Sequence, residues 1–405
     1  MLTSNFRFMS LFLGIVLLIG VVSLAEDFDD DNDFLQIQGN SRLSGKFILM
    51  SNPEKHLITA ITTDDVGNIV LSVENTGKRD LTINLIRYFP TKLYNETGAG
   101  AAFIFCFSAR RDDSNGNNIW MSQDYDIPDR FWDMMPIMRA SGDPHTTTPC
   151  RHLSLYTGES FSKHERIWEL PIWEALVSSV QNNKKDISKI GFSLDIDLSG
   201  KEIYSLPEYT VDQITLRRLQ NLERAAQRQE SKAIPETASD PFRVTLTLSP
   251  KTGDLKAAIC SSGNLYAKVS VDLDRIFGSK EYPDIFLKRF TAKSQNGILT
   301  VLELPSIEET AEYRTLHLEQ NETIAKRCKI WDIAVWSEIL AASRSDRTRK
   351  FELTFPVEVE TIDYTPSEYL NHHKETKREK VTTSATLTLD YATVIRMEKL
   401  QEASE

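Results

Sequence analysis

One segment of the chain concentrates carboxylates and an indole ring in a way that suits ligand binding. Asp124, Asp126, Asp129 and Asp133 lie between residues 124 and 133, together with Trp132. Carboxylates accept hydrogen bonds from sugar hydroxyls or hold a cation, and an indole ring stacks on a sugar or a cation. We therefore take Asp124, Asp126, Asp129, Trp132 and Asp133 as candidate ligand-binding residues. The alternative is a solvated loop that caps one end of a β-sandwich.

The same carboxylates could serve a hydrolase as general acid and base, with His145 or His152 as a further group. Such a site would have to be assembled in space, because the chain contains no HExxH, Gly-x-Ser-x-Gly, Walker or dinucleotide-binding pattern. No CxxC pair or histidine spacing indicates a zinc site. The sequence accordingly assigns no catalytic residue, no metal site and no cofactor.

The N-terminus predicts export. An apolar run over residues 8–24 follows Arg7 and ends in a small-x-small pattern at Ala25. This pattern indicates a secretory signal peptide over residues 1–25, cleaved after Ala25. An uncleaved anchor is the alternative, although the run is shorter than the ~20 residues that span a bilayer. We expect the mature protein to be secreted, with no membrane attachment after cleavage.

Charge and sequons narrow the kinds of partner. The formal net charge is -11, and removal of Arg7 with the signal peptide makes it -12. A strongly acidic chain disfavours nucleic acid and anionic membranes. Asn95 and Asn321 each begin an Asn-Glu-Thr sequon, so an exported eukaryotic protein would carry N-glycans there. The expected partner is an extracellular protein or glycan.

Four cysteines in an exported chain predict disulfides. They are Cys106, Cys150, Cys260 and Cys328. Four cysteines allow three pairings. The simplest joins Cys106 to Cys150 and Cys260 to Cys328, one bridge within each half of the chain.

The chain also repeats itself. Residues 151–177 and 314–340 match without a gap, and eight of these 27 positions are identical: Arg, Leu, Leu, Glu, Lys, Ile, Trp and Trp. An upstream match pairs the segment beginning at Gly67 with the one beginning at Gly263, and a downstream match pairs Ile190 with Phe351. Self-similarity of this kind indicates two related domains.

Short alternating runs of apolar and polar residues in each copy predict antiparallel strands, and one stretch per copy has helical spacing. We expect a mostly β protein of two tandem immunoglobulin-like β-sandwich domains, each with a short helix, plus an amphipathic linker helix that docks between them and a C-terminal helix. The matched tryptophans are expected in the cores. The divisions are a signal peptide (1–25), an acidic disordered leader (26–42), domain 1 (43–210), a helix and linker (211–240), domain 2 (241–391) and a C-terminal helix and tail (392–405).

Three elements resemble a known family. They are the strand and turn Val73-Glu-Asn-Thr-Gly, the charged hairpin turn from Arg110 to Asn118, and Leu155-Tyr-Thr-Gly-Glu-Ser. Together they resemble the β-sandwich pro-region that precedes fungal deuterolysin-type metalloproteases. Because that family's HExxH domain is absent, the resemblance implies a binding or inhibitory module and no protease activity.

We therefore expect a secreted, non-catalytic binding protein of two repeated domains. A secreted hydrolase with an acidic site in domain 1 and a protease-inhibitor-like module are the alternatives.

Overall fold

Antiparallel strands dominate the computed structural model, as the alternating residue pattern predicts. The structure describes residues 47–48, 57–84, 107–112, 118–120, 152–170, 172–182, 188–192, 194–198, 201–205, 208–230, 241–261, 267–294, 297–300, 314–365 and 374–405 of the 405-residue chain. The fold class is therefore mostly β, with few helices. Within these ranges no helix is long and apolar enough to cross a bilayer.

The first half of the chain holds strands on both sides of a short helical segment and ends in a longer helix. Its elements are β1 (Phe47–Ile48), β2 (Leu57–Thr63), β3 (Asn68–Asn75), β4 (Leu81–Asn84), β5 (Phe107–Asp112), β6 (Asn118–Trp120), β7 (His152–Leu155), β8 (Glu159–Arg166), η4 (Ile167–Glu169), α5 (Trp173–Asn182), β9 (Ser188–Phe192), β10 (Leu194–Leu198), β11 (Lys201–Ser205), β12 (Glu208–Val211) and α6 (Gln213–Glu230).

The second half follows the same order and contains two short helices between β15 and β16. Its elements are β13 (Phe242–Leu248), β14 (Asp254–Ser261), β15 (Ala267–Asp272), α7 (Leu273–Phe277), α8 (Ile285–Lys288), β16 (Thr291–Ser294), β17 (Gly297–Thr300), β18 (Thr315–Leu318), β19 (Glu322–Lys329), η5 (Ile330–Asp332), α9 (Trp336–Ser345), β20 (Phe351–Thr365), β21 (Lys374–Leu389) and α10 (Tyr391–Ser404). The bounds of β7, β8, η4 and α5 reappear in β18, β19, η5 and α9 at an offset of 163, so the repeat is a repeat of structure.

The upstream match of the repeat is wrong. β3 pairs with β8 and β14 pairs with β19, so β14 is the counterpart of β3. The glycine that corresponds to Gly67 is therefore Gly253, and not Gly263. Both have a positive φ, 89° and 73°, which glycine adopts readily. Their carbonyls accept the same hydrogen bond, from Ile167 N at 3.0 Å and from Ile330 N at 2.9 Å.

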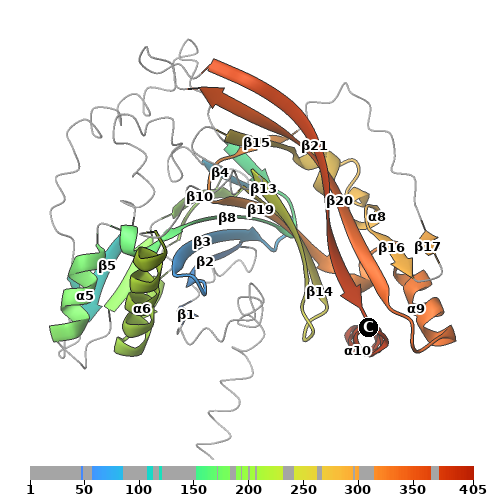
Figure 1. Ribbon diagram of the computed structural model, residues 1–405, viewed down its shortest axis with the longest axis horizontal. Helices are drawn as coiled ribbons and strands as arrows, with labels where there is room; N and C mark the ends of the chain where they lie inside the picture. The colour runs from blue at the N-terminus through green and yellow to red at the C-terminus, as the bar shows by residue number, and fades with distance from the viewer. Residues whose placement is uncertain are drawn as a thin grey trace, which may run out of the picture.

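One six-stranded sheet belongs to both halves. Its strand order is β13-β14-β19-β8-β3-β2, three strands from each half, and every pairing is antiparallel. In Figure 1 this shared sheet forms the middle of an arch, with α5 and α6 at one end and α9 and α10 at the other. Tandem domains were expected, but a sheet that continues from one into the other was not.

A second layer completes the sandwich in each half. In the first half it consists of two sheets, β1-β12-β9-β5-β6 and β11-β10-β4-β7. In the second half it is one sheet, β17-β16-β20-β15-β18, with β21 paired to β20. The two arrangements have the same topology, because β9 and β10 together take the place of β20. The strand bounds also correct the downstream match. β9 begins at Ser188 and β20 at Phe351, again an offset of 163, so Ile190 corresponds to Leu353 and not to Phe351.

Apolar side chains fill the space between the layers. In β3 and β4, Ile69, Leu71, Leu81 and Ile83 are fully buried. Burial of an aliphatic side chain contributes roughly 1.5–3 kcal/mol, so each core stabilises its own half. The second half has an equivalent core, which contains an aromatic cluster of Phe277, Phe286, Phe290 and Phe355.

The two halves meet along the pairing of β8 with β19, around a pseudo-two-fold axis. Phe161 lies directly opposite Ile324, and these are equivalent positions of the repeat. A strand that pairs with its own counterpart about an equivalent residue has the geometry of an isologous dimer interface. Gly158 and Asn321, also equivalent, both have positive φ, and their carbonyls accept hydrogen bonds from the opposite strand, from Arg327 N at 3.0 Å and His164 N at 3.1 Å.

The symmetry explains two of the identical residues of the repeat. Glu322 forms an ion pair with Lys163 and Glu159 forms one with Lys326, each with Nζ and Oε1 3.5 Å apart. The two ion pairs are equivalent contacts, related by the pseudo-two-fold axis. The carboxylates of both glutamates are fully buried. A buried pair depends strongly on its partner, because either charge alone would lie in a poorly solvated site.

A long helix closes each half at its free end. Asp212 and Asp390 cap α6 and α10, and accept hydrogen bonds from Thr215 N at 2.7 Å and Thr393 N at 2.8 Å. An aspartate cap satisfies a free amide of the first turn and stabilises the helix by about 1 kcal/mol. The expected linker helix and C-terminal helix are thus the last element of each repeat.

These end helices pack on their own halves. The indole of Trp173 in α5 donates to Glu223 of α6 at 3.3 Å, and that of Trp336 in α9 donates to Gln401 of α10 at 3.1 Å. The expectation that the linker helix docks between the domains is therefore wrong: its apolar face covers the end of the first half.

Candidate functional site

The acidic cluster of the sequence lies outside the described residues. This applies to Asp124, Asp126, Asp129, Trp132 and Asp133, and equally to His145 of the hydrolase alternative. Ligand binding by these residues stays a prediction. Among the residues that the structure describes, no group of three or more His, Cys, Asp or Glu side chains could hold a metal ion.

The expected bridge between Cys260 and Cys328 is contradicted. Both thiols are free. In the pairing of β14 with β19, Cys260 lies opposite Thr323 and Cys328 lies opposite Leu255, so the two cysteines point to opposite faces of the sheet. They are also five positions apart, about 17 Å at ~3.4 Å per residue, whereas a disulfide needs Cα atoms about 4.4–6.8 Å apart. Cys106 and Cys150 lie outside the described residues.

Of the two sequons, Asn321 is described and Asn95 is not. Asn321 is half-buried in the turn before β19, with a φ of 64°. Its side-chain Nδ2 donates to Glu165 Oε2 at 3.2 Å, across the contact between the halves. A glycan on Asn321 stays a prediction, at a position that helps to join the two halves.

The matched tryptophans divide into two kinds. Trp173 and Trp336 are buried in the cores, as expected. Trp168 and Trp331 are half-buried and pack flat against the backbone of Gly67 and Gly253, where an added Cβ would meet the indole rings at 2.4 and 2.3 Å.

The outer face of the shared sheet, which points away from the sandwich core, is the best-defined candidate surface. In a strand, alternate side chains point to opposite faces. Two neighbouring rows across the middle of this face carry small side chains. These are Ala258, Ala325 and Ser160 in one row and Cys260, Thr323, Ser162 and Ser72 in the next.

Long basic side chains surround these rows. The cations of the outer face are Arg166, Arg243, Lys256, Arg327 and Lys329, and its carboxylates are Glu74 and Asp254. Five cations against two carboxylates leave an excess of three positive charges. The excess stands out because the whole chain has a net charge of -11.

Both carboxylates are engaged in ion pairs within the face. Arg327 Nε lies 2.5 Å from Glu74 Oε1 and so joins the two halves. Lys329 Nζ lies 3.0 Å from Asp254 Oδ1. Arg243 is exposed on β13, at the edge of the sheet. An approaching anion therefore meets cations before it meets a carboxylate.

Burial tunes the ionisable groups at the centre of the face. Desolvation raises the pKa of Glu74, although the charges of Arg327 and Lys256 oppose the shift. Desolvation lowers the pKa of Lys256, against the influence of Glu74. Desolvation also lowers the pKa of His164, so this imidazole is neutral at pH 7. The charge of the face at neutral pH therefore comes from its arginines and lysines.

Equivalent cation and indole pairs mark the two ends of the face. The guanidinium of Arg166 lies 5.8 Å from the ring centre of Trp168, and the ammonium of Lys329 lies 5.6 Å from that of Trp331. Such contacts stabilise a cation by about 0.5–1 kcal/mol at exposed sites. They hold one positive charge on either side of the small-residue rows, at the ends of β8 and β19.

The sequence contains a signal for two of these residues that is not part of any known motif. Arg166 and Lys329 occupy the same repeat position, directly before the identical Ile-Trp pair. What the sequence does not show is that these residues share one face of a sheet.

Comparisons with known proteins add no functional information. Neither the known family models nor the curated proteins include a match to this chain. A solved structure of MtrC from Shewanella baltica OS185 is 7% identical, with 86% of this chain and 69% of that chain covered and a TM-score of 0.13. A likeness at that level carries no argument about fold or function. The resemblance to deuterolysin pro-regions stays a prediction.

Proposed function

We propose that this is a secreted, non-catalytic binding protein that holds an acidic extracellular protein or glycan on the outer face of its shared sheet. The observation that carries the proposal is the excess of cations on that face: Arg166, Arg243, Lys256, Arg327 and Lys329 against two carboxylates that are already paired. In an otherwise acidic chain, a local positive surface attracts anions and orients them on approach.

The shape of the face supports the same proposal. One of its central rows, Ala258, Ala325 and Ser160, is buried, whereas the row of Cys260, Thr323, Ser162 and Ser72 is partly exposed. A ligand would therefore contact this second row and the longer cations around it. Arginine and lysine donate hydrogen bonds to carboxylates and sulfates. The half-buried indoles of Trp168 and Trp331 offer an apolar surface at each end, which suits a sugar ring as well as a peptide.

The connection between the halves gives the face a fixed geometry. The rows cross from one half to the other through the pairing of β8 with β19, and the ion pair of Arg327 with Glu74 spans the same contact. A surface built on strands holds its side chains more firmly than one built on loops. The two halves therefore bind as one unit.

A binding assay with two acidic probes tests the proposal. Heparin represents an acidic glycan and polyglutamate an acidic polypeptide, and each is titrated against the full chain at low and at physiological salt. The double variant Arg243→Glu/Lys329→Glu is expected to bind the preferred probe at least 10-fold more weakly, with a smaller dependence on salt. The matched control is Arg217→Glu, an exposed arginine on α6.

Two results would overturn the proposal. One is the absence of binding to both probes at low salt. The other is an equal loss of affinity in the α6 control, because the chain would then attract anions without using this face. Thermal unfolding of each variant excludes a loss caused by misfolding.

A further inference from the structure

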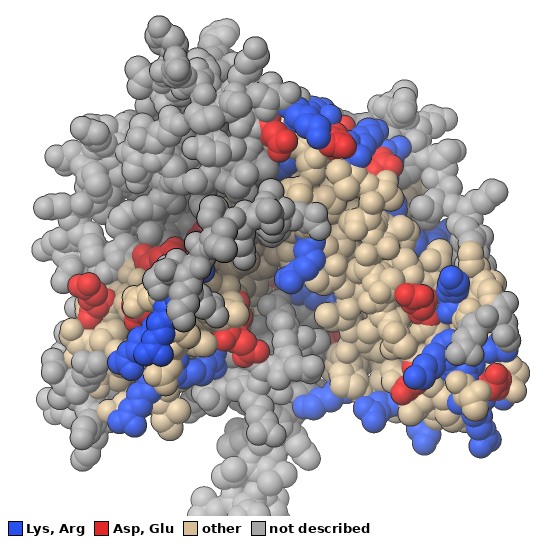
Figure 2. All heavy atoms as spheres, in the orientation of Figure 1, with Lys and Arg blue, Asp and Glu red and all other residues tan. Residues whose placement is uncertain are grey.

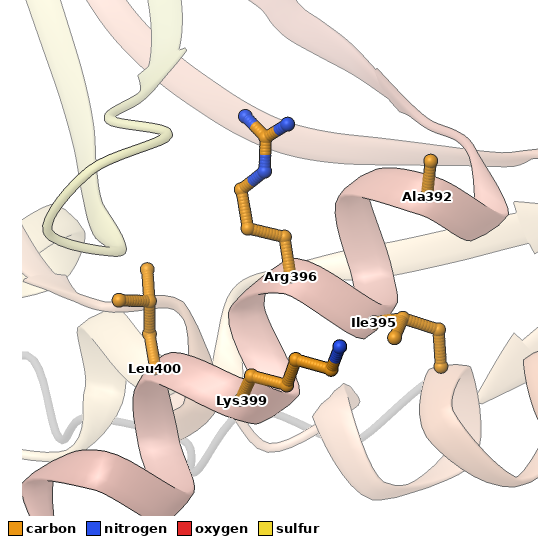
Figure 3. Close-up of a pocket in the computed structure, with 5 residues that line it drawn as sticks. All are labelled: Ala392, Ile395, Arg396, Lys399 and Leu400. Carbon is orange, nitrogen blue, oxygen red and sulfur yellow. The ribbon is translucent and has the colours of Figure 1, made fainter.

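A shallow pocket lies on the outer side of α10, at the free end of the second half. Its volume is about 410 Å³, and it is lined by Ala392, Ile395, Arg396, Lys399 and Leu400 (Figure 3). This volume is within the range of sites that hold small ligands or single side chains. Two cations and the side chains of Ala392 and Ile395 therefore meet on α10, next to Leu400, which also packs against the core of its own half.

The two cations of the pocket have no carboxylate partner in the described chain. Arg396 and Lys399 are exposed and form no hydrogen bond or ion pair there. On the same helix, Glu398 does form an ion pair, with Arg344 of α9. The pocket thus keeps two positive charges beside an apolar surface.

The first half uses the equivalent positions internally. Counted from the capping aspartates, Arg218 and Leu222 of α6 correspond to Arg396 and Leu400 of α10. Arg218 Nη2 donates to the carbonyl of Asp64 at 2.8 Å, in the turn between β2 and β3. Leu222 contacts the same turn, since its Cβ lies 3.5 Å from where a Cβ on Gly67 would be. Helix α6 and the turn between β2 and β3 therefore pack against each other.

The corresponding turn of the second half has a different charge. Asp64 and Asp65 of the first turn are replaced by Pro250 and Lys251 in the second. A lysine there removes the acidic surroundings that Arg218 has in the first half. Figure 2 shows basic side chains gathered over α9 and α10 at this end of the molecule. The second half has thus lost an internal contact and gained an exposed basic and apolar surface.

From this divergence we infer that the α10 pocket is a docking site for an acidic peptide segment of a partner protein that carries a bulky apolar side chain. The carboxylates pair with Arg396 and Lys399, and the apolar side chain enters between Ile395 and Leu400. This site is distinct from the outer face of the shared sheet, where the central side chains are small.

A labelled peptide tests the inference. The probe is a synthetic peptide with the sequence of residues 26–37, Glu-Asp-Phe-Asp-Asp-Asp-Asn-Asp-Phe-Leu-Gln-Ile, which has the required chemistry. Fluorescence anisotropy follows its binding to the full chain. The host chain carries Phe28→Ala and Phe34→Ala, so that its own acidic segment cannot compete by the same contacts.

The expected result is saturable binding that falls at least 10-fold in Arg396→Glu/Lys399→Glu. The matched control Arg217→Glu, on the equivalent helix of the first half, is expected to leave the affinity unchanged. A probe with both phenylalanines changed to alanine should also bind at least 10-fold more weakly, because the apolar anchor is lost. The part of the binding that is lost when both phenylalanines of the probe are changed to alanine should be unaffected by Arg243→Glu/Lys329→Glu, which separates this site from the proposed function.

The inference is overturned if the host chain does not bind the probe, or if charge reversal at Arg396 and Lys399 has no effect. It is also overturned if the probe without phenylalanine binds equally well, because the site would then recognise only the negative charge of the peptide. Binding of anionic vesicles or a DNA oligonucleotide at Arg396 and Lys399, without peptide binding, would assign the surface to a different class of partner.

Discussion

The buried ion pair between Lys163 and Glu322 is expected to connect the two halves of the molecule energetically. The side chains are 3% and 0% exposed, and their charged atoms are 3.5 Å apart. At an effective dielectric constant of 20, two unit charges at this separation attract each other by about 5 kcal/mol, much of which is offset by desolvation. Removal of one partner of a buried pair typically costs about 3–5 kcal/mol.

A double-mutant cycle measures this coupling. We expect Glu322→Gln and Lys163→Met each to lower the free energy of unfolding by about 3 kcal/mol. The double variant should lose at least about 1.5 kcal/mol less than the sum, because neither charge then lies buried without the other. The assay is urea unfolding followed by tryptophan fluorescence. The exposed pair of Arg378 with Glu360, 3.2 Å apart, is the control and should couple by less than about 1 kcal/mol.

A coupling energy below about 0.5 kcal/mol for Lys163 and Glu322 would refute this reasoning. The identity of these residues in both copies would then have a cause other than the contact between the halves. A similar loss in the exposed control would show that the variants act on the unfolded chain instead.

Three further outcomes follow from the described contacts. Gly67→Ala and Gly253→Ala should each lower the free energy of unfolding by at least about 1 kcal/mol, because a Cβ would clash with an indole and the backbone has a positive φ; equal thermal stability to the parent chain would contradict this. Burial lowers the pKa of His164, so the imidazole binds a proton more readily in the unfolded chain than in the folded one. The free energy of unfolding should therefore be highest above pH 6.5 and should decrease as the pH falls. His164→Gln should make the free energy of unfolding less dependent on pH between pH 7 and 5. Burial raises the pKa of the Cys328 thiol, so it should resist iodoacetamide at pH 8 until the protein is unfolded, and recovery of a disulfide-linked peptide would contradict the free thiol.

Much of each half could be predicted from the sequence, because its signals are local. Alternation located the strands around β3 and β20, and helical spacing located α5, α6 and α10. The ungapped repeat at an offset of 163 was confirmed element by element. These features depend on residues close together in the chain, where side-chain periodicity is informative.

The shared sheet could not be predicted in this way. Glu159 and Lys163 are identical to Glu322 and Lys326 in the other copy, but nothing in their spacing says that the two strands pair. Strand pairing between distant segments depends on how whole layers pack. The match of Gly67 with Gly263 failed for a related reason, since it relied on an alternation that any strand has. Gly253 shares with Gly67 the indole packed against it, which only the fold reveals.

The candidate site could not be predicted from the sequence for the same reason. The carboxylates of residues 124–133 lie close together in the sequence and are recognised there, whereas the cations of the outer face come from four separate strands. Arg243 and Arg166 belong to different halves, and the register of the intervening strands brings them to one surface.

The pseudo-two-fold axis through Phe161 and Ile324 has a consequence for how the protein can change over evolutionary time. In a true homodimer, every substitution appears twice, so the two ends of the molecule must remain alike. Here one chain encodes both partners, so a substitution alters one end only. The turns that carry Asp64 in one half and Pro250 in the other show such independent change. A single molecule can therefore present two unlike ends at a fixed separation, as an adaptor between two different partners would require.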